Sequence, residues 1–360
     1  MITSPAPFSF FTNPAIHHKI NTMTKWNDII GHDWAVDFLR SAIQYDRIGQ
    51  SYLITGPSQV GKSTLARVFA QALNCTAVDL KDRPCGKCRS CNLIFAGRHP
   101  DVQIVTGDVS GRGITTLKID QIRELNHQLN LTAAEARYKV AILKKFESAN
   151  PSAANAFLKT LEEPPSNVVL ILTAADSDTL LPTITSRCRV IDLRPVKHSL
   201  VEGELKERWG VEPEQARLLA RLSDGRLGWA VETAQNMVVL DVRDEQLSRL
   251  YIALAGSRVD RFILADELSG KPEILPELLR TWLSWWRDCT LLGVGNRENG
   301  TLTNYDQKSQ MLELLKLRPV AEVVTSLRQT ELAIWQLEHN ANSRLVMENL
   351  LLKYPNRLSG

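Results

Sequence analysis

The sequence predicts an α/β fold with a doubly wound parallel sheet, followed by a region made of helices. A glycine-rich phosphate-binding motif stands between an apolar run and a helical pattern, within residues 52–73. Continuous apolar runs, which are typical of strands buried on both faces, alternate with helical patterns as far as residue 193. Beyond Pro195 the strand patterns fade, and the apolar residues keep helical spacing.

The elements of the sheet region can be predicted in chain order. Apolar residues at helical spacing predict helices at 35–43, from the phosphate-binding motif to about 73, and at about 120–129. Short apolar runs predict strands at 52–55, 102–105, 140–143, 168–172 and 190–193. A glycine-rich loop is expected at 107–113. Residues 1–24 have no regular periodicity, so we expect a poorly ordered extension there, with Met23 as an alternative start.

Two helical blocks are predicted after the sheet. The first, about 199–237, contains apolar residues at helical spacing and a glycine turn at Asp224-Gly225-Arg226. The second runs to the end and carries an apolar stripe at Val323, Leu327, Ile334, Leu337, Ala341 and Leu345. Such a stripe usually faces a core, so the second block is expected to be a helical bundle. The expected domains are 25–195, 196–238 and 239–360.

Length and composition describe a soluble protein of two or three domains. The chain has 360 residues, of which 44% are hydrophobic and 23% charged. A net charge of +3 permits contact with DNA without requiring it. No apolar run approaches the roughly 20 residues that span a bilayer, and the N-terminus lacks the pattern of a secretory signal. We therefore expect a cytoplasmic protein.

The phosphate-binding motif has the full G-x-x-x-x-G-K-[ST] spacing. It consists of Gly56, Pro57, Ser58, Gln59, Val60, Gly61, Lys62, Ser63 and Thr64. Glycines in such a loop let successive N–H groups turn inward at the positive end of the next helix, where they bind phosphates. Lys62 would reach the β- and γ-phosphates, and the Ser63 hydroxyl would ligate Mg²⁺. A plain glycine turn is the alternative, but the Lys-Ser pair between a strand and a helix favours binding of ATP or ADP with Mg²⁺.

Four cysteines lie within seventeen residues and predict a metal site. They are Cys75, Cys85, Cys88 and Cys91, whereas Cys188 and Cys289 are isolated. Two C-x₂-C steps supply thiolate pairs suited to tetrahedral zinc, and four ligands leave no open position, so the zinc would be structural. Four unrelated thiols and an iron–sulfur cluster are the alternatives.

The segment after the strand at 140–143 bears on hydrolysis. A working P-loop ATPase needs an acidic residue there to hold Mg²⁺ and another to orient the attacking water. Here Lys144 and Lys145 follow the strand, and Glu147 is the nearest substitute acid. We therefore expect a chain that binds nucleotide and hydrolyses it poorly, if at all.

Several motifs together resemble a known family. There are five such motifs: Gly31 in Ile29-Ile30-Gly31-His32, the phosphate loop, the four cysteines, the string Asn155-Ala-Phe-Leu-Lys-Thr-Leu-Glu-Glu-Pro-Pro165, and Ser186-Arg187-Cys188. Together they resemble the AAA+ clamp-loader subunits of bacterial DNA polymerase III. The resemblance covers about Trp26 to Tyr354. It implies a RecA-like AAA+ domain with a zinc module inserted at 75–91, a small helical lid at 196–238, and a helical collar at 239–360 that joins five subunits in a ring.

Two branches of this family carry these marks. The motor branch, called gamma or tau, would have an Asp-Glu pair at positions 144 and 145 and an arginine at Gly228, and this sequence has neither. The segments Trp285-Trp286-Arg287-Asp288 and Asn340-x-Asn342-x-x-Leu345-x-x-Glu348 are similar to the delta prime branch. The intact phosphate loop is a departure from many delta prime members.

The delta prime resemblance implies a function without hydrolysis. It implies a stator that works with motor and delta subunits to load the sliding clamp onto primed DNA. Arg187 matches the position that reaches a neighbouring subunit's nucleotide, which makes it the expected trans arginine finger. Two alternatives stay open: a motor ATPase that uses Glu147, and a zinc-dependent nucleic-acid-binding module. The absence of aromatic residues between Cys75 and Cys91 counts against base stacking in the latter.

Overall fold

The computed structural model describes residues 25–109, 115–295, 302–339 and 341–356. The extension expected at 1–24, residues 110–113 of the glycine-rich loop, and Asn340 lie outside them. The described chain divides into two compact units, one made of residues 25–210 and 225–229, the other of residues 211–224 and those from 230 onward. No helix in the described ranges is long and apolar enough to cross a membrane.

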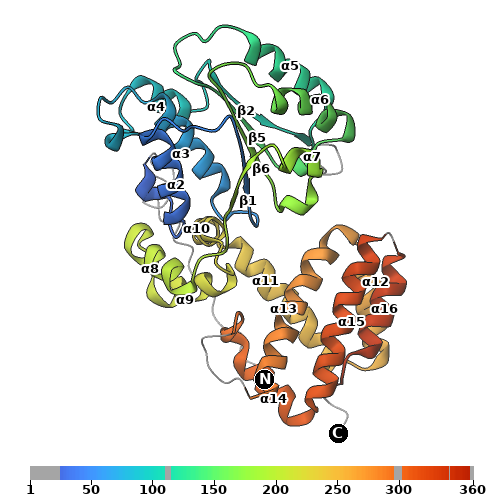
Figure 1. The fold of residues 1–360 in the computed structure, drawn as a ribbon. Helices are drawn as coiled ribbons and strands as arrows, with labels where there is room; N and C mark the ends of the chain where they lie inside the picture. Colours follow the sequence, from blue (N-terminus) through green and yellow to red (C-terminus); the bar gives the residue numbers. More distant parts are fainter. Residues whose placement is uncertain (1–24, 110–114, 296–301, 340, 357–360) are drawn as a thin grey trace. The chain divides into compact units, whose positions relative to one another are not determined.

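The first unit is built on a parallel β-sheet. Its strands are β1 (Ser51–Thr55), β2 (Val102–Thr106), β5 (Lys139–Lys144), β6 (Val168–Thr173) and β7 (Arg189–Asp192). They lie in the order β2-β5-β6-β1-β7, with every neighbouring pair parallel (Figure 1). All the strands predicted from apolar runs are therefore confirmed. β1 and β6 are buried along their whole length, whereas β7 lies at the edge and exposes three of its four residues.

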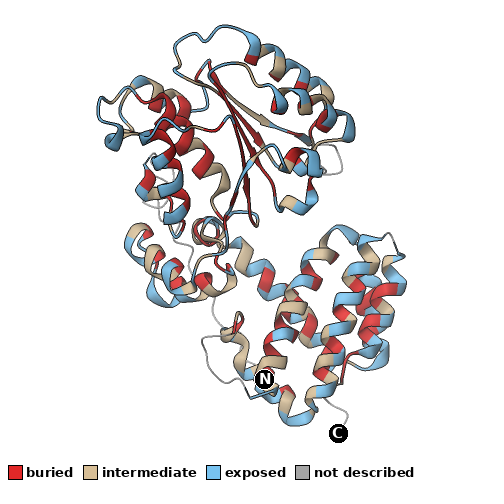
Figure 2. Cartoon of the chain, viewed as in Figure 1, coloured by how far each residue is buried: buried red, intermediate tan, exposed pale blue. Residues whose placement is uncertain are grey.

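Helices cover both faces of this sheet. The helices of this unit are α2 (Asp33–Gln44), α3 (Lys62–Asn74), α4 (Arg89–Phe95), α5 (Ile119–Asn130), α6 (Pro151–Glu162), α7 (Pro182–Thr185) and α8 (His198–Trp209). α2, α3 and α4 lie on one face, and α5 and α6 on the other (Figure 1). Tyr52 of β1 packs edge-on against Phe69 of α3 in the first core, and Phe146 packs against Phe157 of α6 in the second. Figure 2 shows the central strands buried between these layers.

Shorter elements complete the first unit. The strands β3 (Asp108–Val109) and β4 (Thr115–Thr116) form an antiparallel pair at the glycine-rich loop. The 3₁₀ turns are η1 (Trp26–Asp28), η2 (Leu80–Asp82), η3 (Phe146–Ser148) and η4 (Ser177–Thr179). The helix α10 (Leu227–Gln235) begins in this unit.

The second unit is helical, as the sequence predicts. Its helices are α9 (Pro213–Leu222), α11 (Val238–Ala255), α12 (Arg258–Ser269), α13 (Leu275–Gly293), α14 (Lys308–Leu317), α15 (Val320–Glu338) and α16 (Ser343–Lys353), with 3₁₀ turns η5 (Pro272–Ile274) and η6 (Tyr305–Gln307). Three tryptophans of α13, Trp282, Trp285 and Trp286, are fully buried in its core.

The apolar stripe predicted at 323–345 is only partly correct. Val323 is buried, and Leu327, Ile334 and Leu337 pack against the core. Ala341 and Leu345 are exposed. The reason is that α15 ends at Glu338, and the side chain of Asn342 caps a new helix by accepting a hydrogen bond from the Leu345 amide. The three-and-four spacing therefore does not continue across that break.

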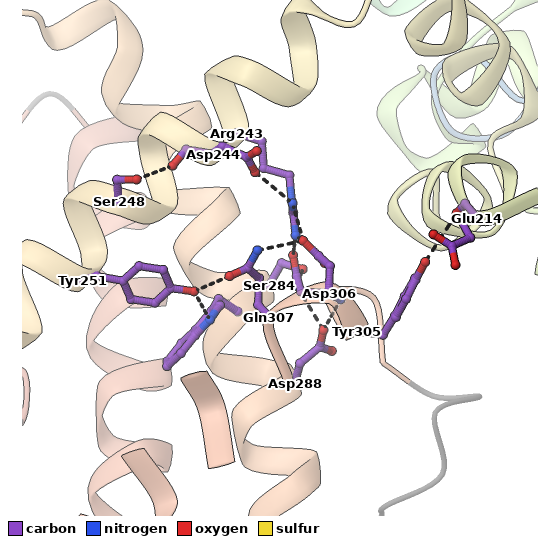
Figure 3. A network of polar contacts seen from close by, with 12 residues as sticks. Glu214, Arg243, Asp244, Ser248, Tyr251, Ser284, Asp288, Tyr305, Asp306 and Gln307 are labelled. Atoms are coloured by element: carbon purple, nitrogen blue, oxygen red, sulfur yellow. Dashed lines mark hydrogen bonds and ion pairs between the residues drawn. The ribbon is translucent and has the colours of Figure 1, made fainter. Parts of the chain in front are cut away.

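A buried polar network lies inside the second unit (Figure 3). The Arg243 guanidinium donates to both carboxylate oxygens of Asp306, at 2.9 Å each, and to Asn304 Oδ1 at 2.9 Å. One oxygen of the buried Asp288 accepts from the Asn304 amide and side chain, at 2.6 and 3.0 Å. The other, Oδ1, has no hydrogen-bond partner among the described residues. Burial raises the pKa of Asp288, although the bonds from Asn304 oppose the shift.

Candidate nucleotide and metal sites

Two glycines shape the phosphate loop between β1 and α3. Gly56 has φ +135°, and a Cβ there would lie 2.1 Å from the Leu193 carbonyl oxygen. Gly61 has φ +116° and directly precedes α3. Both backbone conformations are ones that residues with a side chain rarely adopt. The loop therefore has the strand–turn–helix context that the sequence predicts.

The first turn of α3 leaves donors for an anion. Leu65 is the first helix residue whose amide bonds back to the loop, to Gly61 O at 2.9 Å. The amides of Lys62, Ser63 and Thr64 precede it, and the first amides of a helix have no partner within it. The Lys62 Nζ donates to the carbonyl oxygens of Gly56 and, at 2.8 Å, Pro57. These partners are neutral, so a phosphate oxygen can replace them as a stronger acceptor of the same ammonium.

Two residues that the sequence reasoning did not assign to the loop also hold it. The amide of Gly228, at the start of α10, donates to Gln59 O at 3.0 Å, and a Cβ at Gly228 would lie 2.6 Å from that oxygen. The buried His32 ring has Nε2 3.2 Å from Val60 O. An arginine at Gly228, as the motor branch would require, does not fit this backbone. In the sequence, Gly228 was noted only as the position of the motor branch's arginine, and His32 only as part of the string Ile29-Ile30-Gly31-His32.

Lys144 and Lys145 lie at the carboxyl end of the parallel strands, the end of the sheet that also carries the phosphate loop. Lys144 ends β5, and the Lys145 amide donates to Thr173 Oγ1 at 3.1 Å, while Thr173 is in register with Ile54 just before the loop. Burial lowers the pKa of Lys62, Glu147 opposes that shift, and the nearby charge of Lys145 adds to it. This end of the sheet therefore carries lysines at the positions where hydrolysis would need a metal-binding carboxylate.

Arg187 lies near the start of β7, whereas the phosphate loop follows the end of β1, the parallel strand beside it. Its Nη2 makes an ion pair with Glu162 Oε1 at 2.6 Å, and its Nη1 donates to Thr183 O at 2.7 Å. Cys188 turns inward and packs against the core beside α6, where burial raises its pKa to about 12. Within the Ser186-Arg187-Cys188 motif, the cysteine anchors the segment, and the arginine side chain stays about one third exposed.

The structure brings the four clustered cysteines together. The Sγ atoms of Cys75, Cys85, Cys88 and Cys91 all lie within 4.8 Å of one another. Four thiolates at about 2.3 Å from a tetrahedral zinc would be roughly 3.8 Å apart, so the cluster has the right size. Cys75 caps the C-terminus of α3 and Cys88 caps the N-terminus of α4. These four residues could therefore hold a metal ion.

Backbone amides donate hydrogen bonds to the cysteine sulfurs and thereby stabilise negative charge on them. The amides of Cys85, Cys88 and Cys91 donate to the sulfur of the preceding cysteine of the set, at 3.3–3.4 Å. Burial raises the pKa of Cys88, but hydrogen bonds from Thr76 and Cys91 outweigh it and bring the pKa to about 6. Burial raises the pKa of Cys91 and of Cys75. Amide bonds to sulfur are the surroundings that a metal-bound thiolate needs.

The base of the cysteine module is tied to the sheet and to the start of the unit. The Asn74 side chain exchanges two hydrogen bonds with the Tyr138 backbone, at 2.9 and 3.0 Å. The Trp26 indole donates to Arg83 O at 2.7 Å. Trp26 is buried, so this aromatic residue next to the module cannot stack on bases.

The sheet order and the phosphate loop define the class of the chain: it is a P-loop protein of the RecA-like AAA+ type, with a helical C-terminal region. Its sequence matches the family described as "DNA polymerase III, delta subunit" over residues 31–197. Delta prime subunits from several bacteria are 29–39% identical to it. These similarities support a clamp-loader subunit of DNA polymerase III of the delta prime kind.

Individual relatives come from both branches. The delta prime subunit of Bacillus subtilis is 29% identical over 87% of this chain and 93% of its own length. That of Haemophilus influenzae is 36% identical over 51% of this chain and 54% of its own. The Bacillus subtilis tau subunit is 27% identical over 84% of this chain. The chain spans 56% of that tau subunit and 31% of the Escherichia coli one.

Proposed function

We propose that the chain is the stator of a DNA polymerase III clamp loader, a subunit that binds nucleotide without turning it over. One observation carries this proposal: lysines, and no acid, lie at the end of β5 and directly after it, and the charge of Lys145 reaches Lys62 of an otherwise complete phosphate loop. The charge of Lys145 near Lys62 disfavours Mg²⁺, and neither lysine can orient a water for attack, whereas the loop itself keeps its glycines, amides and lysine. The site is therefore suited to holding a nucleotide and unsuited to hydrolysing it.

The partners follow from the family. The chain would assemble in a five-membered ring with motor subunits of the gamma or tau type and with delta, and the ring would load the sliding clamp onto primed DNA. Residues 196–238 would serve as the lid of the AAA+ domain and residues 239–360 as the collar. Arg187 would act in trans, on the nucleotide of an adjacent motor subunit. Its separation from this chain's own loop supports that role, because its side-chain partners are Glu162, Thr183 and Ser186.

The ligands of the two sites are assigned by chemistry. ATP or ADP would be held by residues 56–64, with Mg²⁺ on the Ser63 hydroxyl as its one protein ligand in the loop. Zinc would be held by the four clustered cysteines, whose two C-x₂-C steps and sulfur spacing suit a tetrahedral ion. With all four positions taken by protein, this zinc would have a structural role.

Nucleotide binding and turnover by the purified chain test the proposal. ATP and ADP should bind in calorimetry, binding should be lost in Lys62→Ala, and it should persist in Lys118→Ala, whose exposed side chain pairs with Asp108 outside the loop. Hydrolysis should stay far below one turnover per second. A wild-type turnover of about 1 per second or more that disappears in Lys62→Ala would overturn the stator function.

A motor function is the second candidate, and one observation favours it. Glu147 lies close enough to the loop for its charge to raise the pKa of Lys62, so an acid is present near the site. If Glu147 orients water, then Glu147→Gln should abolish a measurable wild-type turnover and leave nucleotide affinity almost unchanged. If the chain is a stator, this substitution has no turnover to remove.

A further inference from the structure

Arg187 is held by two groups on different elements. Its Nη2 lies 2.6 Å from Glu162 Oε1 at the end of α6, and its Nη1 donates at 2.7 Å to the carbonyl of Thr183 in α7. The backbone beneath it is fixed too, because the Arg187 amide donates to Ile184 O at 3.1 Å. The guanidinium is therefore fixed at both Nη atoms even though a third of the side chain is exposed.

The position of Glu162 is not explained by the stability of its own helix. It is the last residue of α6, where the helix dipole disfavours a carboxylate, and Glu163 follows it directly. Glu162 is about half exposed, and exposed ion pairs of this kind contribute little to folding stability. What distinguishes Glu162 from Glu163 is its contact with Arg187, since no ion pair or side-chain hydrogen bond of Glu163 occurs among the described residues.

The two contacts leave the arginine able to bind a further anion. A guanidinium has five N–H donors in a rigid planar fork, and only the two contacts to Glu162 and Thr183 are close. A long exposed arginine otherwise loses rotamer freedom when it binds, and a pre-oriented one loses less. The ion pair therefore lowers the entropic cost of bringing Arg187 to a phosphate on another subunit.

We propose that Glu162 is a positioning residue for Arg187, which it holds in the orientation used toward the nucleotide of an adjacent subunit. This inference rests on the proposed trans role of Arg187. It assigns a function to the first glutamate of the Leu161-Glu162-Glu163-Pro164-Pro165 string that the second does not share.

The test uses a clamp loader reconstituted from the full chain and its partner subunits, with primed DNA and the sliding clamp. The single variants are Arg187→Ala, Glu162→Ala, Glu162→Gln and, as the matched control, Glu163→Ala. A fifth complex carries Glu162→Ala and Arg187→Ala together. The rate of ATP turnover at saturating ATP, the KM for ATP and the clamp-loading rate are measured for complexes shown to be fully assembled.

Arg187→Ala should reduce both rates most. Glu162→Ala should lower the turnover of the affected site about two- to tenfold, which matches the cost of ordering one long side chain, with KM unchanged. Glu162→Gln keeps an acceptor oxygen and should fall between Glu162→Ala and wild type. The double variant should be no slower than Arg187→Ala alone, and Glu163→Ala should behave as wild type.

The outcomes separate the inference from the proposed function. If Arg187→Ala has wild-type rates, then the trans role fails and the inference fails with it. If Arg187→Ala is slow but Glu162→Ala is as fast as wild type or faster, then only the inference is overturned. Additive losses in the double variant, or equal losses in Glu162→Ala and Glu163→Ala, would likewise overturn it, because they would show that Glu162 acts independently of Arg187.

Discussion

The phosphate loop of the first unit and the polar network of the second use a basic side chain in opposite ways. Lys62 is partly buried, and its partners are neutral backbone carbonyls of its own loop. Arg243 is buried and is bound by the carboxylate of Asp306 and the amide oxygen of Asn304. A ligand's phosphate can displace a neutral carbonyl, but it cannot readily displace a carboxylate that binds the guanidinium through both of its oxygens. The charge of the partner thus separates a binding site from a structural element.

The cysteine cluster resembles the phosphate loop in this comparison, because its side chains are arranged for a ligand rather than paired with one another. Removing two of its cysteines should have the largest effect. The double variant Cys88→Ala, Cys91→Ala should lose a zinc content of about one per chain and unfold residues 75–91 locally. Structural zinc contributes on the order of 10–16 kcal/mol of apparent binding free energy in small peptides. The sheet has its own core, so the rest of the domain should stay folded.

Elemental analysis and limited proteolysis check this prediction. Cys188→Ala, outside the cluster, should keep the full zinc content. Zinc retained undiminished by the double variant, or absent from freshly purified wild-type protein, would exclude a zinc site at these four cysteines.

Removing the buried arginine should be the next largest effect. Arg243→Ala removes the partner of the partly accessible Asp306 carboxylate and of the buried Asn304 side chain, and loss of such charge-assisted hydrogen bonds costs about 1.5–3 kcal/mol. Arg249→Ala on the same helix is the control, because its partners Glu245 and Glu267 are exposed and the expected loss is below about 1 kcal/mol.

Denaturant unfolding of both variants, together with ATP calorimetry, measures this difference. Nucleotide affinity should be unchanged in each folded protein. Equal unfolding free energies for Arg243→Ala and wild type would show that the network is not structural.

A methyl group at Gly228 should affect the loop moderately. In Gly228→Ala the new Cβ would lie 2.6 Å from Gln59 O, and the resulting backbone shift should cost about 1–3 kcal/mol and weaken nucleotide binding. Gly203→Ala, inside α8 with open space around its Cβ, should instead stabilise by about 0.5–1 kcal/mol. Thermal unfolding and calorimetry compare the two alanines, and a Gly228→Ala protein with unaltered stability and affinity would mean that this contact does not hold the loop.

The smallest expected effect concerns pH and Asp288. Burial raises its folded-state pKa above the unfolded value of about 3.9, so the folded protein binds more protons and stability falls as pH rises between these two values. Asp288→Asn removes that titration, and its stability relative to wild type should increase with pH across the window, by about 1.4 kcal/mol for each pH unit that separates the two pKa values. Urea unfolding from about pH 4 to about pH 8 checks the sign, and a stability difference that is flat or falls with pH would contradict it.

Local patterns predicted most of the sheet because a strand buried on both faces is continuously apolar. The runs at 140–143 and 168–172 became β5 and β6 with one additional residue at most at either end. The phosphate loop and the cysteine cluster could likewise be predicted from the sequence, because their chemistry depends on residues that lie close together in the chain. The helices α4 and α7 were missed because seven and four residues are too few for a period to appear. The longer helix α6 was missed too, although Ala153, Phe157 and Leu161 have helical spacing.

The unpredicted parts of the sites depend on contacts between distant residues. Gly228 meets Gln59, and Glu162 meets Arg187, only after the chain has folded. The spacing of these residues in the sequence does not indicate either contact. The stripe at 323–345 failed for the same kind of reason, because a cap formed by Asn342 interrupts a period that the sequence continues.

The helix α3 has phosphate-binding amides at its beginning and Cys75 at its end. Its thirteen residues make it roughly 20 Å long, more than twice the Debye length of about 8 Å at physiological salt. The charge of a metal centre held by the four cysteines would therefore lie far from phosphates held at the first turn of the helix. Filling one of these two proposed sites would therefore change the electrostatic cost of filling the other only weakly.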